Sequence, residues 1–146
     1  MLQEHKELLI KDLCSRLPYG LMIDYKGIRT KLQNIKVYQL YNGDVIKDYI
    51  CLIDIFGDDD YVNVENIKPY LLPLSSMTEE QKRELNKLSE KECKIIENVV
   101  NNPTSSNVGF PVVVHYMIDW CNKNHFDYHG LIPMGLAIDA TGLNIY

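Results

Sequence analysis

Val45-Ile-Lys-Asp-Tyr-Ile-Cys-Leu-Ile-Asp-Ile-Phe56 is the stretch that most directly indicates how this chain folds. Apolar residues fall on both of its alternating faces, a pattern typical of a strand that is covered on both sides. Asn42-Gly43-Asp44 stands immediately before it and is a strong signal for a hairpin turn. The sequence therefore predicts a central strand at residues 45–56, paired with the segment that precedes the turn.

The neighbouring segments extend this strand into a sheet. Leu21–Tyr25 and Ile28–Tyr41 are rich in strand-forming residues, and Lys26-Gly27 between them favours a tight turn. The alternation of the second segment slips near Gln33-Asn34, which indicates a bulge. With a returning strand at Tyr61–Val64, we predict an antiparallel meander of about four strands.

The first segment has the periodicity of a helix. Leu9, Leu13 and Leu17 recur at every fourth residue of Gln3–Leu17, so they form one apolar stripe. Charged residues cover the other faces: Glu4, Lys6, Glu7, Lys11, Asp12 and Arg16.

The second half of the chain predicts further helices. Asn66–Ser76 contains two prolines, and we interpret it as an irregular apolar connector laid across the sheet. Thr78 and Gln81 fit a capping box at the start of an amphipathic helix, and Pro111 suits the first turn of another. We therefore predict a single α+β domain over residues 1–146, with an N-terminal helix, the meander, and two main helices packed on the sheet.

Composition and charge narrow the classes of function. Acidic residues outnumber basic residues by 20 to 15, and the net charge is −5. Phosphate backbones are held by clustered lysine and arginine, so duplex nucleic acid is not an expected partner. No apolar run approaches the roughly 20 residues that a membrane span needs, and we expect no membrane association.

The cysteines indicate a reducing environment. Cys14, Cys51, Cys93 and Cys121 lie far apart, include no Cys-x-x-Cys pair and have apolar neighbours. This pattern favours reduced, mostly buried thiols, and the polar first residues lack the apolar core of a secretory signal. We therefore expect a cytoplasmic protein.

We expect no metal site and no cofactor, because the sequence contains no metal-ligand, phosphate-loop or nucleophile motif.

The densest group of polar and aromatic residues is His125-Phe-Asp-Tyr-His129. Two imidazoles around a carboxylate can perform acid–base chemistry near neutral pH, so His125, Asp127 and His129 are candidate catalytic residues. The alternative is structural: Asp127 caps a short turn while the aromatic rings pack on the core. Tyr128 and His129 are also candidate ligand-binding residues, because they follow a helix on a loop.

An acidic patch is formed by Asp54 and Asp58–Asp60. Hard cations take oxygen ligands, but the spacing of these aspartates does not match an EF-hand loop. We interpret the patch as a solvated turn.

Ten tyrosines are a high number for 146 residues. Tyrosine supplies a stacking surface and a hydroxyl group. Tyr25, Tyr38 and Tyr49 fall in the predicted strands and are candidate residues of a pocket for a planar ligand such as a base. Tyrosine is also simply a good strand residue, and this alternative stays open.

Three stretches carry a resemblance to known proteins: Lys11-Asp-Leu-Cys-Ser-Arg-Leu-Pro-Tyr-Gly20, Lys68-Pro-Tyr-Leu-Leu-Pro-Leu-Ser-Ser-Met-Thr-Glu-Glu80 and Asp119-Trp-Cys-Asn-Lys-Asn-His-Phe-Asp-Tyr-His-Gly-Leu-Ile132. They resemble small uncharacterised proteins of phages, prophages and other mobile elements of gut bacteria. The stretches sample the beginning, middle and end of the chain. The resemblance implies a setting, the cytoplasm of the host cell, and no mechanism.

We favour a non-enzymatic binding protein that acts on a host component, either a host defence protein or a nucleotide-type signal held by aromatic stacking. A small hydrolase or nuclease-like enzyme that uses His125, Asp127 and His129 is the alternative, and a structural virion component is a further one. The apolar Leu143-Asn-Ile-Tyr146 is expected to pair as an edge strand or to pack on a partner, which favours a homodimer.

Overall fold

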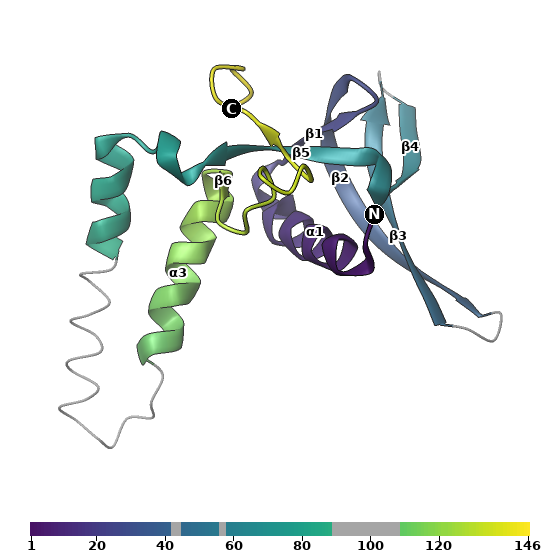
Figure 1. Cartoon of the computed structure of the whole chain (residues 1–146), viewed down its shortest axis with the longest axis horizontal. Helices are drawn as coiled ribbons and strands as arrows, with labels where there is room; N and C mark the ends of the chain where they lie inside the picture. Colours follow the sequence, from purple (N-terminus) through teal and green to yellow (C-terminus); the bar gives the residue numbers. More distant parts are fainter. Residues whose placement is uncertain (42–44, 56–57, 89–108) are drawn as a thin grey trace.

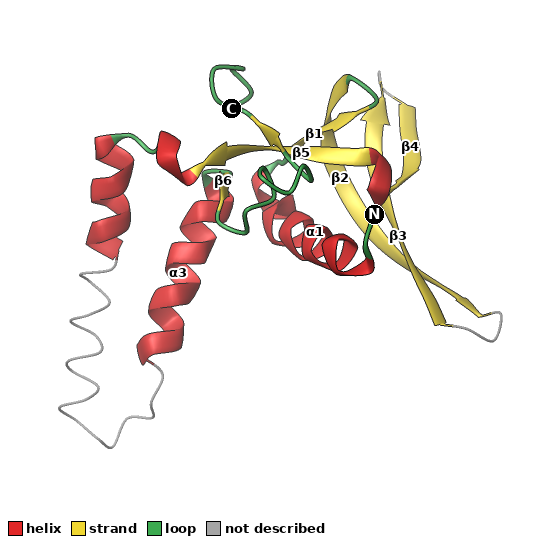
Figure 2. Cartoon of the chain, in the orientation of Figure 1, coloured by secondary structure: helices red, strands yellow, loops and turns green. Residues whose placement is uncertain are grey.

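The computed structural model describes the chain in four stretches: residues 1–41, 45–55, 58–88 and 109–146. The fold is α+β, as predicted. In the described stretches helix α1 (Gln3–Arg16) precedes a sheet of seven strands, and two helical segments follow the fifth strand (Figures 1 and 2). Short 3₁₀ turns lie at Leu17–Tyr19, Val64–Asn66 and Leu74–Ser76.

The first four strands form the antiparallel meander that the sequence predicts. Their bounds are Met22–Tyr25 (β1), Ile28–Tyr41 (β2), Val45–Ile55 (β3) and Asp58–Asn63 (β4). Strand β3 lies between β2 and β4, and the bulge is confirmed, because the register of β2 against β3 shifts between Leu32 and Asn34. Lys26 and Gly27 form the predicted turn, with φ angles of 53° and 84°. The Asn42-Gly43-Asp44 turn lies outside the described residues.

The segment predicted as an irregular connector is a strand inside the sheet. Strand β5 (Ile67–Pro73) pairs antiparallel with β1, and it pairs parallel with β6 (Phe126–Asp127) and β7 (Ile138–Asp139). The sheet is therefore mixed, and the prediction of a purely antiparallel sheet is wrong. The sequence analysis did not predict this strand because it contains Pro69 and Pro73, and proline is rare inside strands.

Helix α1 lies across one face of the sheet (Figure 1). Leu9 and Leu13 of its stripe are fully buried in one apolar core with Ile23 of β1 and Ile53 of β3. Burying a side chain of this size contributes ~1.5–3 kcal/mol, so the contact between α1 and the sheet holds the fold together.

The two later helical segments lie beside the sheet (Figure 1). Residues 79–88 are helical, and α3 (Gly109–Lys123) runs next to them and contacts α1 and β6. We call these two segments the helical pair. Of the two, α3 reaches the sheet at β6, whereas α1 covers the face of the sheet. The capping box is confirmed: the Thr78 N–H donates to Gln81 Oε1 at 2.9 Å, and the Gln81 N–H donates to Thr78 Oγ1 at 3.2 Å.

Two predictions about loops need correction. Asp58–Asp60 belong to β4 and pair with β3, so they are not a turn. Residues 143–146 form no strand. Leu143 is exposed, whereas the Tyr146 hydroxyl donates to the Tyr70 carbonyl oxygen at 2.8 Å, so the tail is fastened to its own sheet through its tyrosine.

The described cysteines are unpaired. Cys51 and Cys121 are buried, whereas Cys14 is exposed, and Cys93 lies outside the described residues. Burial raises the pKa of the Cys51 thiol to about 12, which suppresses its reactivity at neutral pH. No helix in the described stretches is long and apolar enough to cross a membrane.

Candidate functional site

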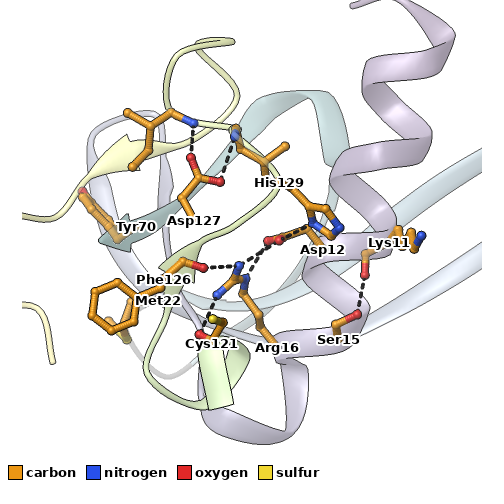
Figure 3. A network of polar contacts seen from close by, with 12 residues as sticks. Lys11, Asp12, Ser15, Arg16, Met22, Tyr70, Cys121, Phe126, Asp127 and His129 are labelled. Atoms are coloured by element: carbon orange, nitrogen blue, oxygen red, sulfur yellow. Dashed lines mark hydrogen bonds and ion pairs between the residues drawn. The ribbon is translucent and has the colours of Figure 1, made fainter. Parts of the chain in front are cut away.

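A buried ion pair on α1 lies at the centre of a network of polar contacts (Figure 3). Asp12 and Arg16 stand one turn apart on the helix, and both side chains are completely buried. Arg16 Nε donates to Asp12 Oδ2 at 2.7 Å, and Arg16 Nη2 donates to Asp12 Oδ1 at 2.9 Å. This two-pronged geometry is the strongest form of a carboxylate–guanidinium contact.

The same guanidinium group reaches two distant segments of the chain. Arg16 Nη2 donates to the carbonyl oxygen of Phe126 at 2.8 Å, and Nη1 donates to the carbonyl oxygen of Cys121 at 3.4 Å. Cys121 lies in the last turn of α3, where carbonyl groups lack partners within the helix. Arg16 therefore fastens α3 and β6 to α1, and we call this arrangement the Arg16 junction.

His129 and Tyr128 form the outer side of the junction. His129 Nδ1 lies 2.9 Å from Asp12 Oδ1, and the histidine side chain is 18% exposed. The Tyr128 ring lies 5.2 Å from the Arg16 guanidinium carbon and 4.2 Å from the His129 ring. Two of the predicted ligand-binding residues thus lie together at the surface, on the buried Asp12–Arg16 pair.

Asp127 has a structural role. Its carboxylate accepts hydrogen bonds from the backbone N–H groups of Leu131 and Ile132, each at 2.8 Å (Figure 3). The carboxylate therefore caps the turn that follows β6, which agrees with the structural interpretation of the sequence.

His125 lies in a different environment from His129. It is 5% exposed, and its ring stacks on Tyr146 with a centroid distance of 3.7 Å and an interplanar angle of 6°. Its Nδ1 has no hydrogen-bond partner among the residues that the structure describes. Burial and, next, the positive charge of Arg16 lower the pKa of His125 to about 4. No hydrogen bond joins Asp127 to either histidine, although all three are described, so the arrangement gives no support to the predicted catalytic cluster.

Of the three tyrosines in the predicted pocket, Tyr25 alone has a described side chain. Tyr25 is half-buried at the end of β1, and the Lys26 ammonium lies 5.0 Å from its ring centroid. Tyr38 pairs with Asp48 and Tyr49 pairs with Val37 in the β2–β3 ladder. The side chains of Tyr38 and Tyr49 lie outside the described part, so a shared pocket stays a prediction.

Two grooves open along the helical pair. The Tyr128 groove has a volume of about 330 Å³ and is lined by apolar atoms of Leu74, Leu85, Met117, Ile118, Cys121 and Tyr128. The Trp120 groove has a volume of about 580 Å³, and charged, amide and apolar side chains line it: Glu84, Lys87, Leu88, Trp120, Lys123 and Asn124. Among the described residues, the two grooves share no lining residue. The first suits an apolar group, and the second suits a ligand with charge.

A metal centre is not supported in the part of the chain that the structure describes. Nowhere in residues 1–41, 45–55, 58–88 and 109–146 do three histidine, cysteine or carboxylate side chains gather closely enough to hold an ion.

Sequence reasoning missed the residues that build the site. It placed Asp12 and Arg16 on solvent-facing sides of the first helix, and it did not single out Trp120. The four-residue spacing of opposite charges beside the Leu9–Leu13 stripe was the available signal, because such pairs lie on one helix face.

Comparison with models of protein families, with curated proteins and with solved structures found no match. The resemblance to proteins of phages and mobile elements stays a prediction.

Proposed function

We propose that this chain is a non-enzymatic binding protein of a phage or mobile element that acts on a host protein in the host cytoplasm, and that the Tyr128 groove is its binding surface. One observation carries the proposal: a predicted ligand-binding residue, Tyr128, lines an apolar groove that stays open to solvent. Leu74 and Ile118 on its rim are 46% and 38% exposed. Open apolar patches of this kind mark interaction sites on soluble proteins.

The chemistry of the groove favours a protein segment over a nucleotide-type signal. None of its lining residues in the described stretches is charged, so a phosphate group would find no counter-charge among them. Its volume of about 330 Å³ falls at the small end of the range for ligand sites, ~300–1,000 Å³. An apolar side chain on a partner's helix matches these properties, since helices commonly dock apolar residues into grooves.

The way in which neighbouring residues hold the Tyr128 ring also supports a binding role for this residue. An aromatic anchor contributes most when little of its freedom is lost on binding. Tyr128 rests on Arg16, whose guanidinium is fixed by Asp12 and by the Phe126 carbonyl oxygen. The ring is therefore held in place before a partner arrives.

Affinity capture from host lysate, followed by calorimetry with the purified captured protein, tests the proposal. Tyr128→Ala should weaken binding by about 2 kcal/mol or more, roughly thirtyfold in Kd. His129→Ala should weaken it less, because His129 does not line the groove. Both variants should lose more affinity than stability.

Tyr61→Ala is the matched control. Tyr61 is a 54% exposed tyrosine on β4, away from the groove, so its removal should leave binding unchanged. Equal binding by Tyr128→Ala and the unmodified protein would refute the assignment of the groove. Light scattering of the free protein separately tests the expected homodimer.

A further inference from the structure

The Trp120 groove offers a flat aromatic surface that is fixed in position. The Trp120 ring stacks on Phe126 at a centroid distance of 5.6 Å and an interplanar angle of 8°. Phe126 is fully buried in β6, and its carbonyl oxygen accepts a hydrogen bond from Arg16. Phe126 thus backs the indole from the core side, and the remainder of the indole lines the groove.

The same groove contains basic side chains without acidic partners. Lys87 and Lys123 both line it, and neither forms an ion pair within the described stretches. Lys82, on the same helix as Lys87, differs: its ammonium lies 2.7 Å from Glu79 Oε1. Glu84 is the one acid among the described lining residues, so these residues together carry an excess of positive charge on a protein whose net charge is −5.

We propose that the Trp120 groove binds a small planar anion of the nucleoside monophosphate class. The base stacks on Trp120, as bases stack on aromatic platforms in proteins that bind single strands. Lys87 and Lys123 hold the phosphate through charge-assisted hydrogen bonds. Glu84 accepts hydrogen bonds from the sugar hydroxyl groups. A volume of about 580 Å³ lies within the ~300–1,000 Å³ that ligand sites occupy.

This ligand site is separate from the proposed function, because none of the described residues lines both grooves. Both grooves lie along the same two helical segments, but the two proposed ligands would contact different described residues.

The chain contains a single tryptophan, which makes its fluorescence a direct reporter of the groove. Titration with AMP should change Trp120 emission in a saturable way, and calorimetry with AMP should give the same Kd. Adenosine has the base without the charge, and inorganic phosphate has the charge without the base. Each should bind at least about tenfold more weakly than AMP, because adenosine lacks the charge-assisted hydrogen bonds and phosphate lacks the stacking of the base on Trp120.

Matched lysine variants separate a specific site from general charge. Lys87→Gln and Lys123→Gln should each weaken AMP binding by about tenfold, whereas Lys82→Gln, with the same change of charge on the same helix, should leave it unchanged. All three variants should keep the thermal unfolding midpoint of the parent protein.

Three results would overturn the proposal: no AMP binding by calorimetry, equal affinity for AMP and adenosine, or the same loss of affinity in Lys82→Gln as in Lys87→Gln. The first result would show that the groove does not bind AMP. The second would show that the phosphate makes no favourable contact, and the third would show that the lysines act only through the net charge of the protein.

Discussion

In the Arg16 junction the charged groups are buried and paired, whereas in the Trp120 groove two lysines face open space without acidic partners in the described chain. Arg16 reaches a carboxylate and two backbone carbonyl groups within 3.4 Å. Lys87 and Lys123 lie on the helical pair and line the Trp120 groove. The two regions therefore differ in role: the junction stabilises the fold, and the helical pair carries the two grooves for which we propose binding.

Removing one partner of the buried pair should have the largest effect on stability. Arg16→Met leaves the Asp12 carboxylate buried without its cation, so the free energy of unfolding should fall by about 3–5 kcal/mol. Urea unfolding followed by circular dichroism measures this change. The double variant Asp12→Leu/Arg16→Met should recover part of the loss, because neither charge is then buried alone. A loss below about 1 kcal/mol in Arg16→Met would show that the junction is not the structural centre.

A pH dependence should follow from His125. Its pKa is lowered from the ordinary 6.5 to about 4 in the folded protein, so the unfolded chain binds the proton more tightly. The stabilising effect is complete above pH 6.5 and is lost as the pH falls toward 4, by an amount on the order of 2–3 kcal/mol. Unfolding midpoints between these values measure it.

His125→Phe is the control for this pH dependence, since it keeps a ring for Tyr146 to stack on and removes the titrating group. The difference in stability between the two proteins should change across the window. Parallel curves for the parent and the variant would assign the pH dependence to other groups.

Loss of the capping box should act only on the helical pair. Thr78→Ala removes the bond that Gln81 N–H donates to the threonine hydroxyl, and about 1 kcal/mol of local helix stability should be lost. Amide exchange should accelerate in residues 79–88 while exchange in α1 stays unchanged. Gln81→Ala, which removes only the reciprocal bond, should have a smaller effect. Equal acceleration in α1 would mean that the two regions unfold together.

The smallest effect on stability is expected at the rim of the Tyr128 groove. Ile118→Gln should change the free energy of unfolding by no more than about 0.5 kcal/mol, because Ile118 is 38% exposed. The same variant should weaken binding of the captured host protein. A large loss of stability would show that Ile118 serves the core.

Local patterns predicted most of the fold. The leucine stripe of α1, the turn at Lys26-Gly27 and the Thr78 capping box depend on residues within a few positions of each other, and the structure confirms them. The parallel pairing of β5 with β6 and β7 joins residues more than 50 positions apart, and no local pattern carries that information.

The candidate site was less accessible to sequence reasoning. The sequence pointed to the loop with Tyr128 and His129, and in the structure these two side chains lie beside Arg16 and Asp12. Its buried support was missed, because the hydrophobicity of Asp12 and Arg16 taken singly predicts exposure, and only their mutual pairing makes burial tolerable.

The hydrogen bonds from Arg16 to residues far along the sequence affect the order in which the chain folds. Its two carbonyl acceptors lie 105 and 110 positions further along the sequence, and β5 gains its parallel neighbours only from residues 126–127 and 138–139. During synthesis α1 and the meander can form early, but β5 remains an open edge until the last quarter of the chain arrives. Non-local closure of this kind slows folding, and an open edge invites pairing with other chains. We therefore expect the rate of that final docking step to determine how long newly made molecules remain prone to aggregation. The strength of any local element should matter less.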